Sequence, residues 1–229
     1  MNKKKIISTI LACAMLPFGG LISASAQDTK PTYVQLNPAD ASPFNNGEFQ
    51  GWGTALCWWA NRLGYSEKLT NAAAEAFFSD KGLGLDIARY NLGGGDDPTH
   101  NHINRSDSKV PGVYSDYKLS SDGKDVESIT YDITKDQNQL NIAKAALKAN
   151  PDLYFEGFSN SAPYFMTKTG CTSGGGTVNS DGTVTSNGKL NNLNDDMYDD
   201  FAKFIADATK LFKDNGIEFK SYSPMNEPD

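Results

Sequence analysis

The sequence predicts an α/β fold in which short apolar strands alternate with amphipathic helices, and two observations support this expectation. Three stretches carry apolar residues at three- and four-residue spacing, the repeat of a helix with one buried face. Each of them is followed within a few residues by a short apolar run, which is the order of βα units that feed a parallel sheet. The composition fits a globular chain, since 38% of the 229 residues are apolar and 21% are charged.

The apolar repeat places the helices at residues 66–78, 137–149 and 195–213. In the last of them Phe201, Phe204 and Ala208 belong to one apolar face, Asn194 can cap the start, and Gly216 follows the final turn. In the first helix we expect a buried stripe formed by Leu69, Ala72, Ala73, Ala76 and Phe77.

The strands are expected at residues 51–56, 85–92, 153–158 and 219–224, with 33–36 as a further candidate outside this series. Two connections are longer than a helix requires, 93–136 and 159–193. Both follow the carboxyl ends of strands, where α/β folds place ligand sites. We therefore expect these two segments to be long loops that contribute to a site.

A doubly wound sheet and a barrel are both compatible with this order of elements. No glycine-rich phosphate-binding turn follows the first strand, because Gly51-Trp52-Gly53 lies inside the predicted strand and precedes bulky residues. The barrel is therefore the favoured architecture.

Residues 1–26 have the pattern of an export signal, with lysines at 3–5, a long apolar run, and small residues up to a cleavage site at Ala26. We expect a secreted or periplasmic protein. Lipidation at Cys13 is the alternative, which would anchor the protein at the cell surface and give its only membrane association. The net charge of −7 argues against nucleic acid as a partner.

Cleavage at Ala26 would leave two cysteines, Cys57 and Cys171, in an oxidising compartment. They are candidates for a disulfide that closes a long loop. Two unbonded thiols are the alternative, because the sequence does not show whether their Cα atoms come within about 7 Å.

The most informative motif is Asn226-Glu227-Pro228, at the end of the fourth predicted strand. A glutamate in a cleft can donate a proton when its pKa is raised, and a neighbouring asparagine can hold a sugar hydroxyl. An exposed turn glutamate is the alternative interpretation of so short a motif.

Polar and aromatic residues also gather at the ends of the other three strands. In chain order these ends read Cys57-Trp58-Trp59, Arg89-Tyr90-Asn91-Leu92-Gly93-Gly94-Gly95-Asp96-Asp97, and Phe158-Ser159-Asn160-Ser161-Ala162-Pro163-Tyr164-Phe165. Indole rings offer flat faces on which sugars stack, although one of two adjacent tryptophans should be core, because neighbouring side chains of a strand point opposite ways.

With these residues in view, the chain resembles glycoside hydrolase family 30, and within it the endo-β-1,6-galactanase-like branch. The resemblance covers about residues 49–228 through four motifs in order: Gly-Trp-Gly-Thr followed by Trp-Trp, Arg-Tyr-Asn-x-Gly-Gly-Gly-Asp-Asp, Ser-Asn-Ser-x-Pro-Tyr, and Asn-Glu-Pro. It implies a (β/α)8 TIM barrel with a small β-domain at its side. Residues 49–229 would then be the N-terminal half of the barrel, strands one to four, and 27–48 an extension that adds a strand to the β-domain.

The resemblance also implies a retaining glycosidase without a cofactor, in which Glu227 is the acid/base and Asn226 its sugar-binding neighbour. Arg89 matches the arginine that supports the nucleophile, and Asp96 matches a carboxylate that holds the non-reducing-side sugar. Further substrate-binding candidates are Trp58, Asn160, Tyr164 and Phe165. Related xylan- and glucosylceramide-acting enzymes carry Ser-Pro-Trp-Ser where this chain has Phe-Ser-Asn-Ser at 158–161, which favours the galactanase-like branch.

In that family the nucleophile is a glutamate on strand seven, whereas this sequence ends at Asp229. We therefore expect the N-terminal half of a longer enzyme, inactive by itself, that cleaves β-1,6-galactan polysaccharide or oligosaccharide when complete. A related endo-β-1,6-glucanase or xylanase is an alternative, as is a non-catalytic glycan-binding protein. No metal is expected, because His100 and His102 form only a His-x-His pair.

Overall fold

The computed structural model describes residues 35, 37, 43–99, 109–172, 176–181, 183–186 and 191–226. The chain divides into two compact units, Met1–Glu48 and Phe49–Asp229. In the first unit the structure describes the short 3-10 helix η2 (Phe44–Gly47), and Gln35, in the predicted strand at 33–36, has no strand structure. The other residues of that predicted strand lie outside the described part of the chain.

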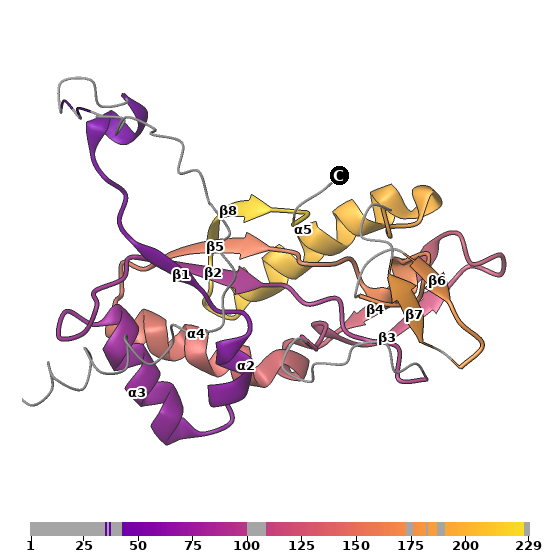
Figure 1. Ribbon diagram of the computed structural model, residues 1–229, viewed down its shortest axis with the longest axis horizontal. Helices are drawn as coiled ribbons and strands as arrows, with labels where there is room; N and C mark the ends of the chain where they lie inside the picture. The colour runs from indigo at the N-terminus through magenta and orange to yellow at the C-terminus, as the bar shows by residue number, and fades with distance from the viewer. Residues whose placement is uncertain are drawn as a thin grey trace, which may run out of the picture. The chain divides into compact units, whose positions relative to one another are not determined.

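A four-stranded parallel sheet runs through the described part of the second unit. Its strands are β1 (Gly53–Ala55), β2 (Ile87–Asn91), β5 (Tyr154–Phe158) and β8 (Phe219–Ser223). They lie side by side in chain order (Figure 1), whereas a doubly wound sheet reverses its strand order at a switch point. Each strand falls within its predicted range, so the parallel α/β prediction is confirmed.

The described helices of this unit are α2 (Trp59–Leu63), α3 (Glu67–Phe78), α4 (Gln137–Ala149) and α5 (Tyr198–Asp214). The three predicted helices are thus confirmed, with a 3-10 turn, η6 (Asp195–Met197), in front of α5. Asn194 occupies the cap position of that turn, but its side chain makes no capping hydrogen bond there. Within the described residues no helix combines the length and the apolar character needed to cross a bilayer.

The buried face of α3 differs in part from the predicted one, since only Ala73 is buried and Phe77 partly buried as expected. Leu69, Ala72 and Ala76 are exposed, and the buried stripe consists of Thr70, Ala73, Ala74 and Phe78. Both sets follow the helical repeat, because an alanine-rich helix offers two apolar faces of similar strength. Packing of α3 against α4 selects between them.

The core lies between the sheet and the helices α4 and α5. Tyr90 of β2 is fully buried, and its ring meets Phe212 of α5 edge to face with 4.7 Å between centroids. Its hydroxyl donates to Asp136, directly before α4, at 2.7 Å. Since one side chain reaches both α5 and the start of α4, the two helices cover the same face of the sheet, as in units wound in one direction.

Two segments predicted to be loops contain hairpins, so that prediction is wrong for these residues. The first is formed by β3 (Tyr114–Leu119) and β4 (Val126–Tyr131), and the second by β6 (Gly176–Val178) and β7 (Val184–Ser186). In the first hairpin, the partly buried Tyr117, Leu119, Ile129 and Tyr131 alternate with exposed residues. That period of two is the signal the sequence offered.

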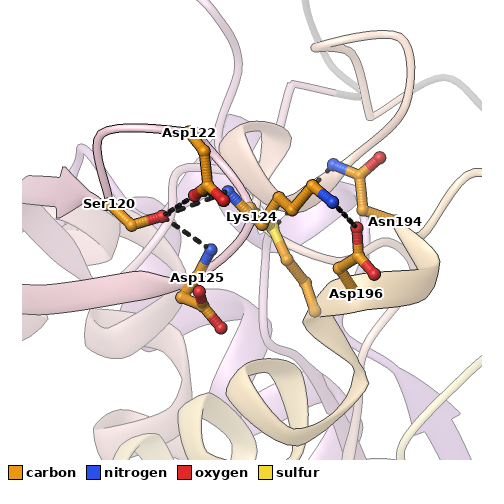
Figure 2. Close-up of polar contacts among 7 residues, drawn as sticks. Ser120, Asp122, Lys124, Asp125, Asn194 and Asp196 are labelled. Atoms are coloured by element: carbon orange, nitrogen blue, oxygen red, sulfur yellow. Dashed lines mark hydrogen bonds and ion pairs between the residues drawn. The ribbon is translucent and has the colours of Figure 1, made fainter.

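The β3–β4 hairpin lies against the start of α5 (Figure 2). At its tip, Ser120 Oγ accepts a hydrogen bond from the Lys124 N–H at 3.2 Å. Lys124 Nζ lies 3.8 Å from a carboxylate oxygen of Asp196 in η6, and the Val126 N–H donates to Asp200 of α5 at 2.8 Å. Through these contacts the hairpin inserted after β2 binds to η6 and α5.

Candidate functional site

The loops that follow the parallel strands meet at the carboxyl edge of the sheet. The Ser159 N–H, after β5, donates to the Ser223 carbonyl of β8 at 3.1 Å, and the Asn226 N–H donates to the Ser159 carbonyl at 3.0 Å. These bonds place Asn226 beside the loop after β5, in agreement with the order of the motifs. Glu227 lies outside the described residues, so its acid/base role stays a prediction.

Arg89 points to the sheet face opposite Tyr90, because neighbouring residues of a strand alternate between faces. Its Nε donates to Glu156 Oε1 at 2.7 Å across the β2–β5 register, and its guanidinium lies 3.8 Å from the Phe158 ring centroid. The side chains of Arg89 and Glu156 are 32% and 33% exposed. The pair is therefore a charged feature that solvent can reach, and one bond does not exhaust the five N–H donors of an arginine.

The glycine-rich loop after β2 is fixed by two backbone contacts. Gly94 O accepts from the Tyr114 hydroxyl at 2.7 Å and from the Tyr164 N–H at 3.0 Å. Asp96 in the same loop is 15% exposed and lies 3.3 Å from Lys109 Nζ. A lysine therefore accompanies the predicted sugar-binding carboxylate. Lys109 could not be predicted from the sequence, because only the folded loop brings it there.

The two neighbouring aromatic candidates differ in exposure. Phe165 is 7% exposed, with its ring stacked on Tyr117 at 3.9 Å between centroids, so it is a core residue and the prediction that it contacts sugar is corrected. Tyr164 is partly exposed, and burial together with a hydrogen bond to Tyr117 raises its pKa. Tyr164 therefore keeps its phenol proton and remains the aromatic candidate in this loop.

Of the two adjacent tryptophans, Trp59 has the core role. Its Nε1 donates to the Ala55 carbonyl at 2.8 Å, and its ring packs on Phe77 of α3 with 5.0 Å between centroids. Trp58 is partly buried and remains the candidate for a sugar platform.

No disulfide joins Cys57 and Cys171, so the bridge that the sequence left open is not formed. Cys57 follows β1 and Cys171 follows β5, and β2 lies between these strands. Burial raises the pKa of the Cys57 thiol, against an opposing effect of the Arg89 charge.

A buried polar cluster next to the carboxyl edge of the sheet was not predicted from the sequence. Its members Tyr90, Asn91, Asp136 and Gln139 are each at most 1% exposed. Burial raises the pKa of the Asp136 carboxyl to about 7, and hydrogen bonds from Tyr90 and Gln139 oppose the rise. Asn91 Oδ1 accepts from the backbone N–H of Asn160, whose side chain is exposed.

Several predicted features lie outside the described residues: the signal at 1–26 with Cys13, the pair His100 and His102, and Glu227. Among the residues that are described, no group of three or more His, Cys, Asp or Glu side chains is placed to hold a metal ion.

A parallel sheet in chain order with a polar carboxyl edge is the arrangement of a β/α enzyme domain. The model of O-glycosyl hydrolase family 30 matches residues 44–229, and the chain belongs to this family.

The chain is similar to two curated relatives and to one solved structure. The chain is 28% identical to an exo-beta-1,6-galactobiohydrolase of Bifidobacterium longum subsp. longum, over 97% of this chain and 17% of that protein. It is also 28% identical to an endo-beta-1,6-galactanase of Hypocrea rufa, over 93% of this chain and 43% of that protein. A conserved exported protein from Bacteroides fragilis is 25% identical with a TM-score of 0.59, over 78% of this chain and 34% of that one. The chain thus spans less than half the length of each.

Proposed function

We propose that the complete protein is an exported, retaining glycoside hydrolase that cleaves β-1,6-linked galactan. Membership of family 30 supports the reaction class, and the names of both curated relatives point to β-1,6-linked galactose as the substrate. The observation that carries the proposal is the bond from the Asn226 N–H to the Ser159 carbonyl, because it brings Asn226, the first residue of the Asn-Glu-Pro motif, to the carboxyl edge of the sheet.

In this proposal Glu227 protonates the glycosidic oxygen as the bond breaks, while Asn226 holds a hydroxyl of the sugar. The Lys109–Asp96 pair and Tyr164 would contact the neighbouring sugar, and the Arg89–Glu156 pair would set the field at the reacting carbon. A retaining mechanism needs a second carboxylate about 5–5.5 Å from the acid. We assign it to a glutamate outside residues 1–229, in the other half of a (β/α)8 barrel.

The test is an assay of the complete protein on β-1,6-galactan, β-1,6-glucan and xylan, with the anomeric form of the first product followed by NMR. The proposal expects galactan to be cleaved with the highest kcat/KM and with retained configuration. Preference for glucan or xylan would overturn the substrate, and an inverted product would overturn the mechanism. Binding of galactan without turnover would indicate a glycan-binding protein.

A further inference from the structure

At Asn91, strand β2 extends past the end of its neighbour β1. Strand β1 ends at Ala55, and the last bond from that side runs from the Leu56 N–H to the Arg89 carbonyl at 2.9 Å. Two residues further along β2, the backbone groups of Asn91 point to the same edge. Asn91 is 1% exposed, so water does not satisfy these groups, and a buried backbone pair without partners is costly.

The side chain of Gln139, in the first turn of α4, takes the place of the missing strand. The Asn91 N–H donates to Gln139 Oε1 at 3.1 Å, and Gln139 Nε2 donates to the Asn91 carbonyl at 2.9 Å. Nε2 also donates to Asp136 Oδ2 at 2.6 Å, and the Tyr90 hydroxyl donates to that same oxygen at 2.7 Å. The carboxyl oxygen therefore fixes which end of the amide faces each backbone group.

Asn91, which Gln139 holds in this way, contacts the loop after β5 at the candidate site. Asn91 lies two residues after Arg89, so its side chain points to the same sheet face, and its Oδ1 accepts from the Asn160 N–H at 3.3 Å. The carbonyl of the same peptide unit belongs to Ser159 and accepts from the Asn226 N–H at 3.0 Å. Because a peptide unit is planar and stiff, it transmits the position of Asn91 to Asn226.

We propose that Gln139 is a positioning residue of the candidate site, which sets the place of Asn226 through Asn91 and the Ser159–Asn160 peptide unit. The inference rests on the proposed function, since it assigns a support to that site. The hydrogen bonds that lead from Gln139 through Asn91 and the Ser159–Asn160 peptide unit to Asn226 are called the relay here, and they can be measured without substrate.

The test compares Gln139→Leu with Gln137→Leu in the complete protein. Gln137 begins the same helix, is exposed, and bonds only to Asn141 among the described contacts, so it controls for a polar-to-apolar change on α4. We expect hydrogen exchange at the Asn160 and Asn226 amides to accelerate about tenfold or more in Gln139→Leu alone. Turnover of galactan should fall through kcat rather than KM, also by about tenfold.

Unchanged exchange at both amides in a folded Gln139→Leu protein would overturn the inference. So would an equal acceleration in the β3–β4 hairpin, because that result indicates general loosening. Changed exchange in a protein without galactanase activity would leave the relay standing and remove the proposed function. Galactan cleavage with unchanged exchange would overturn the relay and leave the proposed function standing.

Gln139→Glu keeps the shape of the side chain and tests the relay if the leucine variant does not fold. The ionisable groups around this position are Asp136, in direct contact, and Tyr90, which shares the Asp136 carboxyl. When ionised, the substituted carboxylate accepts from the Asn91 N–H but cannot donate to the Asn91 carbonyl, whereas its protonated form donates once. We expect amide protection at Asn160 and Asn226 to be lost at neutral pH and partly regained in acid. Protection equal to wild type at all pH values would contradict the relay.

Discussion

The two faces of strand β2 handle charge in opposite ways. On one face, Tyr90 leads to a carboxyl at Asp136 that is 1% exposed and has a pKa raised by burial to about 7. On the other face, the carboxylate of Glu156 is paired with Arg89, and both side chains are about one third exposed, at 33% and 32%. On the buried face, Tyr90 and Gln139 both donate hydrogen bonds to the Asp136 carboxyl, while on the open face the charged pair is partly exposed.

The largest predicted effect concerns the pH dependence of the buried face. The folded-state pKa of Asp136 is raised from 3.8 to about 7, so the folded protein binds a proton that the unfolded chain has released. The free energy of unfolding should therefore fall between about pH 4 and about pH 7, by at most about 4 kcal/mol from this group. Asp136→Asn should lack this contribution. Urea denaturation across that range measures it, and equal pH slopes in both proteins would contradict the assignment.

A smaller effect is expected from Tyr90→Phe, which removes only the hydroxyl. The ring keeps its packing on Phe212, while Asp136 Oδ2 loses one of its two donors. Loss of a buried hydrogen bond should lower the free energy of unfolding by about 1–3 kcal/mol, most strongly above pH 7, where the carboxyl is ionised. A variant as stable as wild type at alkaline pH would show that the hydroxyl does not hold the carboxyl.

The smallest effect on stability should come from Glu156→Gln on the open face. A partly exposed ion pair contributes less than about 1 kcal/mol, and glutamine still accepts from Arg89 Nε. The variant should lower galactanase activity more than stability, because the charge lies at the proposed reacting centre. A large fall in the free energy of unfolding with full galactanase activity would contradict the assignment of the Arg89–Glu156 pair to the site.

Much of the fold follows from local pattern. The faces of α5 and the four parallel strands could be predicted because Phe201, Phe204 and Ala208 repeat with the helix and the strands are short apolar runs. The face of α3 could not, since alanines on both sides make the pattern ambiguous. The β3–β4 hairpin was missed because two consecutive polar residues in each strand, Ser115-Asp116 and Glu127-Ser128, break its alternation.

The site divides in the same way. Arg89, Asp96 and Asn226 could be assigned to one rim because carboxyl ends of parallel strands meet at one edge. The Asp136–Gln139 cluster could not, since its bonds to Tyr90 and Asn91 join residues 46 and 48 positions apart. The burial of Phe165 likewise depends on Tyr117, from a hairpin that was not predicted.

The acid/base role of Glu227 is tested most directly by comparing Glu227→Gln with Glu218→Gln in the complete protein. Glu218 precedes β8 at the opposite edge of the sheet, where hydrogen bonds from Lys220 and Lys213 lower its pKa to about 2. We predict that Glu227→Gln reduces kcat on β-1,6-galactan by about 100-fold or more while Glu218→Gln leaves it unchanged. Equal turnover by wild type and Glu227→Gln would contradict the account.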